Sequence, residues 1–362
     1  MRLDRRIASG VVLGLTVAVA SFPATPQRPG HGPLLSECDG AIRELVIQYV
    51  PEAKPTVGAA YRDFLIALPA EVTVRVVCPD RAAFDELRTI IGPVACRLEP
   101  VVTGHAMTCW ARDRWLALGP AAKGPTILLS PAAEDGEEVW PARAGDRRIG
   151  EDLARALRGI EARRSPLAFD GGDFAADGET VFVSPRVGRR NPGLSEEALR
   201  NRLDPLLGRK VVLLRDAPDH HVAMYMALTG NRTALVGDPS LARAILGDGA
   251  GDASRETQAR FDAVARAVAA AGYRVVRIPV APGADGRSWL TPTNAIMDER
   301  DGERAVYLPV FRHAEPLNRA ATRIWESLGY TVRRVDCTET FSHFGSIHCL
   351  VNVLRRGELN GQ

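Results

Sequence analysis

Short apolar runs rich in Val and Ile alternate along the chain with longer segments of helical spacing. Residues 71–78 form one such run and end in Pro79-Asp80, a helix start signal, so we expect a strand there and a helix over 81–91. The same pattern predicts further strands, at 94–102, 126–130, 180–184, 211–215, 234–237 and 305–311. Strands that alternate with helices predict an α/β fold.

Two segments with the same pattern lie 57 residues apart and indicate an internal repeat. Amphipathic helices are expected at 258–271 and 317–328, and each leads through Gly-Tyr into a strand, at 272–278 and 329–335. The spacing suits one β-hairpin and one helical crossover per unit, which favours a repeated α/β architecture. The alternative is coincidence, because glycine after a helix and β-branched residues in a strand both have local causes.

The start of the chain carries a targeting pattern. Three arginines within the first six residues precede the apolar run 7–20, which ends in small residues, and this is typical of an export signal. The run is shorter than the roughly 20 residues of a membrane span, although an uncleaved leader would act as a weak anchor. We expect a signal peptide over 1–24, a Pro- and Gly-rich linker over 25–34, and a single folded domain over 35–356 of a periplasmic or secreted protein.

Composition sets broad limits on the chemistry. With 46% apolar and 25% charged residues the chain is typical of globular proteins. The formal net charge of +2 comes from the leader, so neither a basic patch nor a nucleic-acid partner is predicted, and no later apolar run is long enough to span a membrane. Six cysteines in an exported chain raise the question of disulfides, and Cys78 with Cys96 is the pair we expect.

The stretch 341–350 holds the candidate nucleophile. Cys349 follows a Gly345-Ser346 turn and precedes the apolar run 350–354, which is predicted to be a strand that holds the thiol at its start. A buried cysteine at a strand edge is the alternative, and it is the more frequent case for an isolated cysteine. Acidic and imidazole-bearing segments upstream favour the nucleophile.

Two acidic segments are candidates for binding a cation. Asp113 lies among arginines and close to Trp110, so its carboxylate is suited to a cation that the indole covers; the alternative is an ion pair beside core tryptophans. Asp170 and Asp173 flank two glycines that let the backbone bend, so the two acids need not diverge. The alternative there is a hairpin entry with solvated acids.

Histidines and an asparagine complete the candidates. His220 and His221 precede an alternating apolar segment, where an imidazole would act as general acid and base for a thiol. Adjacent residues point to opposite faces of a strand, so at most one of the two is expected to enter a site. Asn294 follows Pro292 and either stabilises that turn, donates to a substrate or orients a catalytic loop. The histidines lack the paired spacing of zinc ligands, so a zinc site is the less favoured interpretation.

Taken in order, these segments resemble the guanidino-group-modifying enzymes of the pentein superfamily, which include agmatine deiminase, bacterial peptidylarginine deiminase and dimethylarginine dimethylaminohydrolase. The similarity covers roughly 110–354. Five segments in the expected order make a specific signal. They are Trp110-Ala111-Arg112-Asp113, Asp170-Gly171-Gly172-Asp173 with Arg190-Asn191-Pro192, Thr293-Asn294, Tyr307-Leu308-Pro309, and Ile347-His348-Cys349.

The resemblance implies a five-bladed α/β propeller of ββαβ-type units and a cysteine-dependent amidine hydrolase, a deiminase of agmatine, arginine or peptidyl-arginine, that needs no metal or cofactor. A guanidinium is a poor electrophile, so the site must bind it bidentately, hold a thiolate near its carbon and protonate the departing nitrogen; the intermediate would be a thiouronium. The implied catalytic residues are Cys349 as nucleophile, His221 as general acid and base, and Asp113 and Asp170 as guanidinium-binding carboxylates; the implied substrate-binding residues are Trp110, Asp113, Asp170, Asp173 and Asn294.

The chain departs from the family two positions after His221. The agmatine and arginine deiminase branches have a second guanidinium-binding Asp there, whereas this chain has Ala223, and the dimethylarginine branch also lacks that Asp. Losing one charge-assisted contact costs about 1.5–3 kcal/mol, which argues against agmatine as the substrate. A non-catalytic pentein that binds a cationic ligand and an amidinotransferase are the alternative functions.

Overall fold

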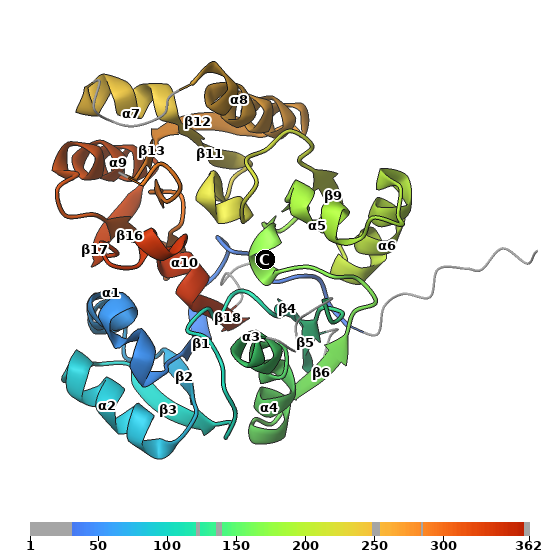
Figure 1. Ribbon diagram of the computed structural model, residues 1–362, viewed down its shortest axis with the longest axis vertical. Helices are drawn as coiled ribbons and strands as arrows, with labels where there is room; N and C mark the ends of the chain where they lie inside the picture. Colours follow the sequence, from blue (N-terminus) through green and yellow to red (C-terminus); the bar gives the residue numbers. More distant parts are fainter. Residues whose placement is uncertain (1–30, 121–123, 135–139, 248–253, 284, 358–362) are drawn as a thin grey trace, which may run out of the picture.

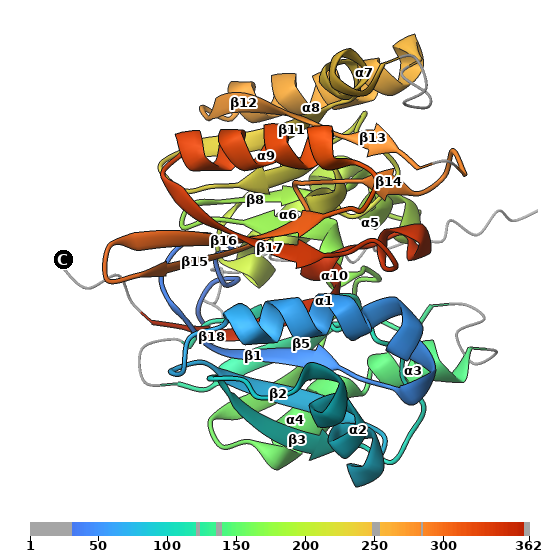
Figure 2. The ribbon, with the colours of Figure 1, turned by 90° about the vertical axis from the view of Figure 1, so that its left-hand side faces the viewer.

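The computed structural model describes residues 31–357 except 121–123, 135–139, 248–253 and 284. In this part of the chain the strands form five sheets of three or four strands and one two-stranded ribbon. Figure 1 shows the larger sheets arranged around a common centre, with helices such as α2, α4, α6 and α8 on the outer side. Figure 2 shows the same elements from the edge, where strands and covering helices lie in layers. The α/β fold class is confirmed.

The strands are β18 (Val351–Arg356), β1 (Ile42–Gln48), β2 (Thr73–Cys78) and β3 (Arg97–Val102) in the first sheet; β4 (Leu116–Leu118), β5 (Thr126–Ser130) and β6 (Ile160–Arg164) in the second; β7 (Phe174–Ala176), β8 (Thr180–Val183) and β9 (Lys210–Leu213) in the third; β10 (Met226–Leu228), β11 (Thr233–Asp238) and β12 (Arg274–Pro279) in the fourth; β15 (Ile296–Arg300), β16 (Glu303–Val310) and β17 (Tyr330–Asp336) in the fifth; and β13 (Ala281–Pro282) with β14 (Trp289–Leu290) in the ribbon.

The helices are α1 (Lys54–Ala67), α2 (Arg81–Ile91), α3 (Pro141–Asp146), α4 (Ile149–Ala156), α5 (Pro185–Arg190), α6 (Glu196–Leu207), α7 (Pro239–Leu246), α8 (Arg255–Ala270), α9 (Glu315–Ser327) and α10 (Ile347–Leu350), with short 3-10 turns η1 (Pro51–Ala53), η3 (Gly171–Asp173), η4 (Val222–Met224) and η5 (Phe341–His343). Among the described residues, none of these helices combines the length and the apolar character that a membrane span requires.

One pairing pattern recurs in all five larger sheets. Each has an antiparallel pair followed by a parallel strand, as in β10–β11–β12 and β15–β16–β17. The segments that lie 57 residues apart supply β12 and β17, the parallel third strands of these two sheets. The predicted internal repeat is therefore a structural unit, because a hairpin and a helical crossover precede each of these strands.

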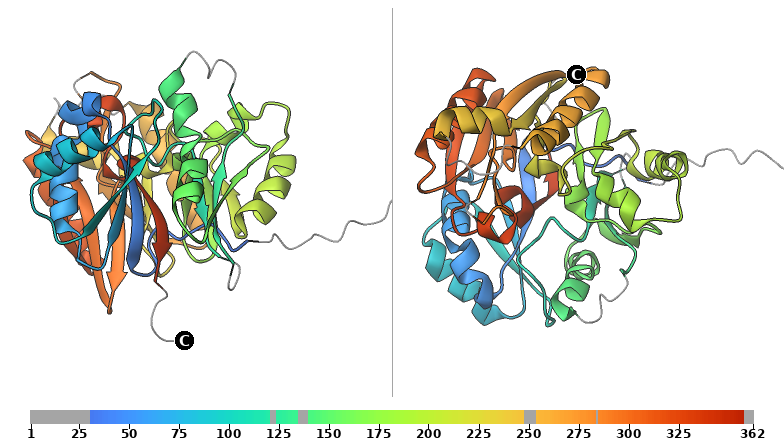
Figure 3. Two further views of the ribbon diagram at one scale, coloured as in Figure 1. Left: turned by 90° about the horizontal axis from the view of Figure 1, so that it is seen from below. Right: turned by 45° about the horizontal axis from the view of Figure 1, so that its top comes forward.

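The last strand pairs with the first. β18 runs antiparallel to β1, with Val351 opposite Ile47, and the two lie side by side in both views of Figure 3. This pairing brings α10, which carries Cys349, to the middle of the ring of sheets (Figure 1). The site is therefore built at a position that segments from several sheets reach.

Most predicted boundaries agree with the structure to within three residues, and α2 covers the predicted 81–91. The predicted signal peptide, 1–24, and residues 25–30 of the linker lie outside the described residues. The disulfide that we expected is wrong, since Cys78 and Cys96 are both free. Their sulfurs face different backbone carbonyls, that of Val101 for Cys78 and that of Leu65 for Cys96.

Trp325 on α9 connects the core to the loop that carries Asn294. The indole is fully buried and meets the Tyr330 ring edge-on, with centroids 5.0 Å apart. Its Nε1 donates to the carbonyl of Pro292 at 3.3 Å, so the helix supports the loop directly.

We expect Trp325→Ala to lower the free energy of unfolding by about 3–5 kcal/mol, because a large cavity replaces the indole. Urea unfolding followed by circular dichroism measures this change. Trp140→Ala is the matched control: Trp140 is 69% exposed, so its loss should change stability by no more than about 0.5 kcal/mol. Equal urea midpoints for the two variants would show that Trp325 does not support the core.

Candidate active site

Residues that are far apart in the sequence line one cavity of about 230 Å³. Cys349, His221, Asp113, Asp170 and Trp110 all contribute, so the structure brings together the four residues to which we assigned catalytic roles and the tryptophan beside them. The full lining is Trp110, Asp113, Arg143, Asp170, Arg186, His220, His221, His343, Phe344 and Cys349.

Cys349 lies in the one-turn helix α10, directly before β18 and not in the strand itself. Asn294 holds this turn in two ways: its Nδ2 donates to the Cys349 sulfur at 3.3 Å, and its Oδ1 accepts from the backbone N–H of His348 at 3.1 Å. The thiol is therefore fixed in position at the wall of the cavity, and it is free of any disulfide.

The Cys349 thiol is set up as a thiolate. Burial alone would raise its pKa, but the nearby His221 and His348 imidazoles and their positive charge lower the pKa to about 5. Burial acts in the usual direction on the other cysteines: it raises the pKa of Cys78 and Cys96 to about 11 and that of Cys109 to about 12. Cys349 therefore differs from the buried structural cysteines that were the alternative interpretation.

His221 is held by Asp170, whose Oδ2 lies 3.3 Å from the ring Nε2. Burial alone would lower the pKa of His221, but the hydrogen bond to Asp170 and the nearby Cys349 thiol raise it well above its ordinary value. The ring lies against Gly172, where a Cβ atom would lie 2.5 Å from the ring Nδ1. A side chain at Gly172 would therefore clash with the imidazole, so this position must be glycine for the ring to lie there.

The prediction that only one of the two histidines enters the site is wrong, because both His220 and His221 line the cavity. His221 precedes the 3-10 turn η4 and not a strand, so the two side chains are not forced to opposite faces. Burial and the charge of His221 lower the pKa of His220 to about 3, so His220 is neutral next to a charged partner.

Arginines surround Asp170. Its carboxylate accepts from Arg190 at 2.6 Å and from Arg143 at 2.7 Å, and Arg114 and Arg186 approach at 3.3 and 3.4 Å. Burial alone would raise the pKa of Asp170, but the hydrogen bonds from His221 and Arg190 hold it well below its ordinary value. Asp170 is therefore ionised and anchors the charges around it.

Arg143 was not among the predicted residues, and it reaches both guanidinium-binding candidates. Besides its contact with Asp170, its Nη1 lies 3.9 Å from Asp113 Oδ2. Arg143 lies on α3, inside the stretch 132–150, which is rich in Asp, Glu and Gly. The sequence marked this long acidic stretch as a whole, and nothing in it distinguished Arg143 from the other residues of the stretch.

Asp113 differs from Asp170 in its charge state. Burial raises the pKa of Asp113 to about 8. The negative charge of Asp170 adds to this increase, and the positive charge of His221 opposes it. A cation that enters the cavity would favour the ionised form of Asp113, so binding of a cation is coupled to release of a proton.

Two predicted substrate-binding residues lie behind the cavity wall. Asp173 is fully buried and its Oδ2 accepts from the backbone N–H of Asp170 at 2.9 Å, which fixes the turn η3. Asn294 is also fully buried, and its amide donates to the sulfurs of Met224 and Cys349. Of the alternatives for Asn294, the structure fits an orienting role for the Cys349 loop.

The mouth of the cavity is formed in part by the turn before Cys349. Phe344 has a φ of 67° and is 42% exposed, and the next residue is Gly345. A Cβ atom on Gly345 would lie 2.6 Å from the Trp110 ring and 3.2 Å from Cys349 Cβ, so this turn needs a glycine to lie between the two. Within the described residues, no group of three or more His, Cys, Asp or Glu side chains is arranged to hold a metal ion.

The family model of the Porphyromonas-type peptidyl-arginine deiminases matches residues 47–353. The chain belongs to this family. No curated protein matches it by sequence.

Solved structures of deiminases share the fold of this family member. The agmatine deiminase of C. jejuni is 15% identical, with a TM-score of 0.70 and coverage of 91% of this chain and 98% of that chain. A Porphyromonas gingivalis structure, provisionally named an arginine deiminase, is 22% identical, with a TM-score of 0.69 over 89% and 97%. The agmatine deiminase of Enterococcus faecalis is 15% identical, with a TM-score of 0.68 over 92% and 98%. Our assignment to the pentein superfamily is confirmed.

We expect Cys349 to react with iodoacetamide at half its maximal rate near pH 5, because a thiolate is the reactive form. Mass spectrometry of the labelled peptides measures the rate at each pH. Cys349→Ala should abolish labelling below pH 7, since burial raises the pKa of Cys78, Cys96 and Cys109. A midpoint near the ordinary pKa of a cysteine thiol would show that the imidazoles do not hold Cys349 as a thiolate.

Proposed function

We propose that this protein is a deiminase that hydrolyses a C–N bond of an arginine-type guanidine through a covalent intermediate on Cys349. The observation that carries the proposal is the meeting of a low-pKa thiol, a charged imidazole and two carboxylates around one cavity. Family membership supports the same class of reaction.

In the proposed first half-reaction, the Cys349 thiolate attacks the guanidinium carbon and a C–S bond forms. The C–N bond to the leaving nitrogen breaks, and His221 gives that nitrogen its proton, so ammonia or an amine departs. A thiouronium remains on the sulfur. The raised pKa of His221 means that the proton is in place before the substrate arrives.

In the second half-reaction, neutral His221 takes a proton from water, and the resulting hydroxide attacks the thiouronium carbon. The C–S bond breaks, the hydroxyl proton of the adduct passes to water as its C=O bond forms, a ureido product leaves, and the thiolate and the imidazolium are restored as the starting ion pair. Asp113 and Asp170 would bind the planar cation and Trp110 would cover it, which keeps the carbon near the sulfur.

The proposed substrate is a free or peptide-bound arginine derivative. Ala223, a buried residue of η4 whose carbonyl accepts from the Thr293 hydroxyl, brings no second carboxylate. This loss counts against agmatine and equally against unmodified arginine, so we propose a derivative of arginine. We also propose that the five larger sheets are the blades of a five-bladed propeller, in agreement with their repeated pairing pattern. Export remains a proposal that rests on residues 1–24, and it would make the substrate extracytoplasmic.

We expect purified protein to form a ureido product from arginine derivatives and Cys349→Ala to form none. His221→Gln should lower the rate by roughly 10²–10⁴, the usual contribution of a general acid and base. Colorimetric detection of ureido groups and of ammonia measures both. Cys96→Ala is the control, because this buried cysteine lies outside the cavity lining and should leave turnover intact. Transfer of the amidine to an added amine would instead indicate an amidinotransferase.

Arg143 favours a second candidate function, a protein that binds cations without turnover. Its guanidinium already lies against Asp170 and near Asp113, the two carboxylates assigned to the substrate. The same contacts support the proposal that this pair of acids binds a guanidinium. In a deiminase, the substrate must therefore displace Arg143 or share the carboxylates with it.

We expect Arg143→Met to lower KM for a guanidine substrate by about ten- to a hundredfold with little change in kcat, since a competing charge-assisted contact of about 1.5–3 kcal/mol is removed. Steady-state kinetics measures the two constants. Arg189→Met is the matched control: Arg189 lies on α5 and pairs with Asp219 on the surface. A higher KM in Arg143→Met would mean that Arg143 binds substrate, and tighter cation binding with no turnover in either protein would favour the second candidate.

A further inference from the structure

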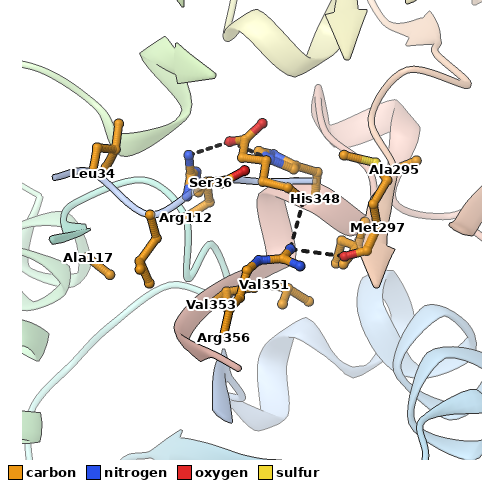
Figure 4. A pocket seen from close by; sticks show the side chains of 13 residues that line it. Leu34, Ser36, Arg112, Ala117, Ala295, Met297, His348, Val351, Val353 and Arg356 are labelled. Atoms are coloured by element: carbon orange, nitrogen blue, oxygen red, sulfur yellow. Dashed lines mark hydrogen bonds and ion pairs between the residues drawn. The ribbon is translucent and has the colours of Figure 1, made fainter. Parts of the chain in front are cut away.

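A second, smaller cavity of about 30 Å³ lies beside the turn that carries Cys349 (Figure 4). It has room for a water molecule. Cys349 lines the large cavity, whereas its neighbour His348 lines this small one, so the two side chains of α10 face different spaces. The other charged residues here are Glu37, Arg112 and Arg356.

The N-terminal segment, residues 31–40, forms one wall of the small cavity and is bound to helix α6 and to two sheets. Backbone N–H groups of Leu34, Leu35 and Glu37 donate to the carbonyls of Leu207 at 2.8 Å, Ala117 at 3.0 Å and Ala176 at 2.8 Å. The linker predicted over 25–34 therefore ends in ordered structure, and residues 35–40 are fixed within the ring of sheets. These contacts place the Glu37 carboxylate between strands that come from different units.

Glu37 makes close contact with two cations. Its Oε1 accepts from Arg112 Nη2 at 2.6 Å and lies 3.1 Å from Nε2 of His348. The Glu37 and His348 side chains are 10% and 9% exposed, so water screens this pair weakly. Arg356 donates to the backbone carbonyl of Glu37 at 2.7 Å, which fixes the acid in this position.

The Glu37–His348 pair repeats the arrangement of Asp170 and His221. In both, the ring Nε2 is next to a carboxylate, at 3.1 and 3.3 Å, and in both the imidazole interacts with the Cys349 thiol. The ring Nδ1 of each histidine is buried and finds no hydrogen-bond partner within the described part of the chain. Two carboxylate–imidazole pairs thus meet at one sulfur.

We propose that Glu37 is a positioning residue that keeps His348 protonated, so that a permanent imidazolium stabilises the Cys349 thiolate from the side opposite to the substrate. The proposal rests on the proposed role of Cys349. His348 itself is the second cation of the thiolate, and the N-terminal segment completes the site because it supplies the acid.

The charges that face His348 support this arrangement. Burial alone would lower the pKa of His348, but the negative charge of Glu37, the neighbouring Cys349 thiol and the hydrogen bond with Glu37 raise it, while Arg112 opposes the increase. Burial alone would raise the pKa of Glu37, and His348 and Arg112 lower it. The acid is therefore ionised and the imidazole charged.

A second cation has a use in the proposed reaction. His221 must lose its proton to the leaving nitrogen and regain one from water, so its charge changes during turnover. His348 faces the small cavity and takes no part in that transfer. Its charge is therefore present when the thiolate is the leaving group, whatever the state of His221.

Alkylation of Cys349 by iodoacetamide in the full-length protein tests the proposal without any turnover. We expect Glu37→Gln to move the midpoint of the pH–rate curve upward by about one pH unit, because the imidazole loses its charge partner. Glu37→Asp should restore part of the shift. Glu44→Gln is the matched control: Glu44 is buried on β1 and pairs with Arg75 and Arg355, so its loss should leave the midpoint unchanged.

A double-mutant cycle assigns the effect to His348. His348→Asn should raise the midpoint by itself, and Glu37→Gln should add nothing in that background. An unchanged midpoint in Glu37→Gln, an equal shift in Glu44→Gln, or additive shifts in the double variant would each overturn the proposal. If Glu37→Gln does not fold, an unchanged midpoint in His348→Asn overturns it. A low midpoint in the wild-type protein that turns over no guanidine would defeat the proposed function and leave this inference standing.

Discussion

A buried thiolate persists only where cations compensate its charge, and the centre of this molecule is organised by that requirement. Moving an unpaired charge from water into a protein interior is strongly unfavourable. Here the Cys349 sulfur interacts with His221 and His348, and each imidazole in turn lies against a carboxylate. Asp170 is balanced by several arginines. The charges therefore form a connected network in which each ion depends on its neighbours, and deletion of one leaves another uncompensated.

The ring of sheets supplies the rigidity that such a network needs. Charged groups that are fixed at short distances interact strongly only if their supports do not relax. The supports here are backbone turns at the inner ends of strands: η3 before β7, η4 before β10 and α10 before β18. Gly172 and Gly345 allow the turns to approach a ring more closely than a side chain would permit. The role of these glycines is thus to let the backbone lie close to the rings, more than to make the turns flexible.

The sequence allowed much of the fold and part of the site to be predicted. Helix and strand positions followed from local periodicity, and Cys349, His221, Asp113 and Asp170 followed from the order of segments that resemble the deiminases. Arg143 and Glu37 could not be found in this way. Arg143 lies in the stretch 132–150, where no candidate residue was predicted, and Glu37 lies just beyond the expected linker. Both meet partners far along the chain only after folding. The errors have local causes: a strand was assumed where η4 forms, and Cys78 and Cys96 were paired although their sulfurs face different carbonyls.

The pairing of β18 with β1 determines when the charge network around Cys349 can form. Because β1 waits for a partner that is more than 300 residues further along the chain, a growing polypeptide on the ribosome cannot complete its first sheet. Contacts between such distant segments form late and slow the folding of a chain. The sulfur of Cys349 is also made after every other group that activates it. The low pKa of its thiol therefore arises only in the folded molecule.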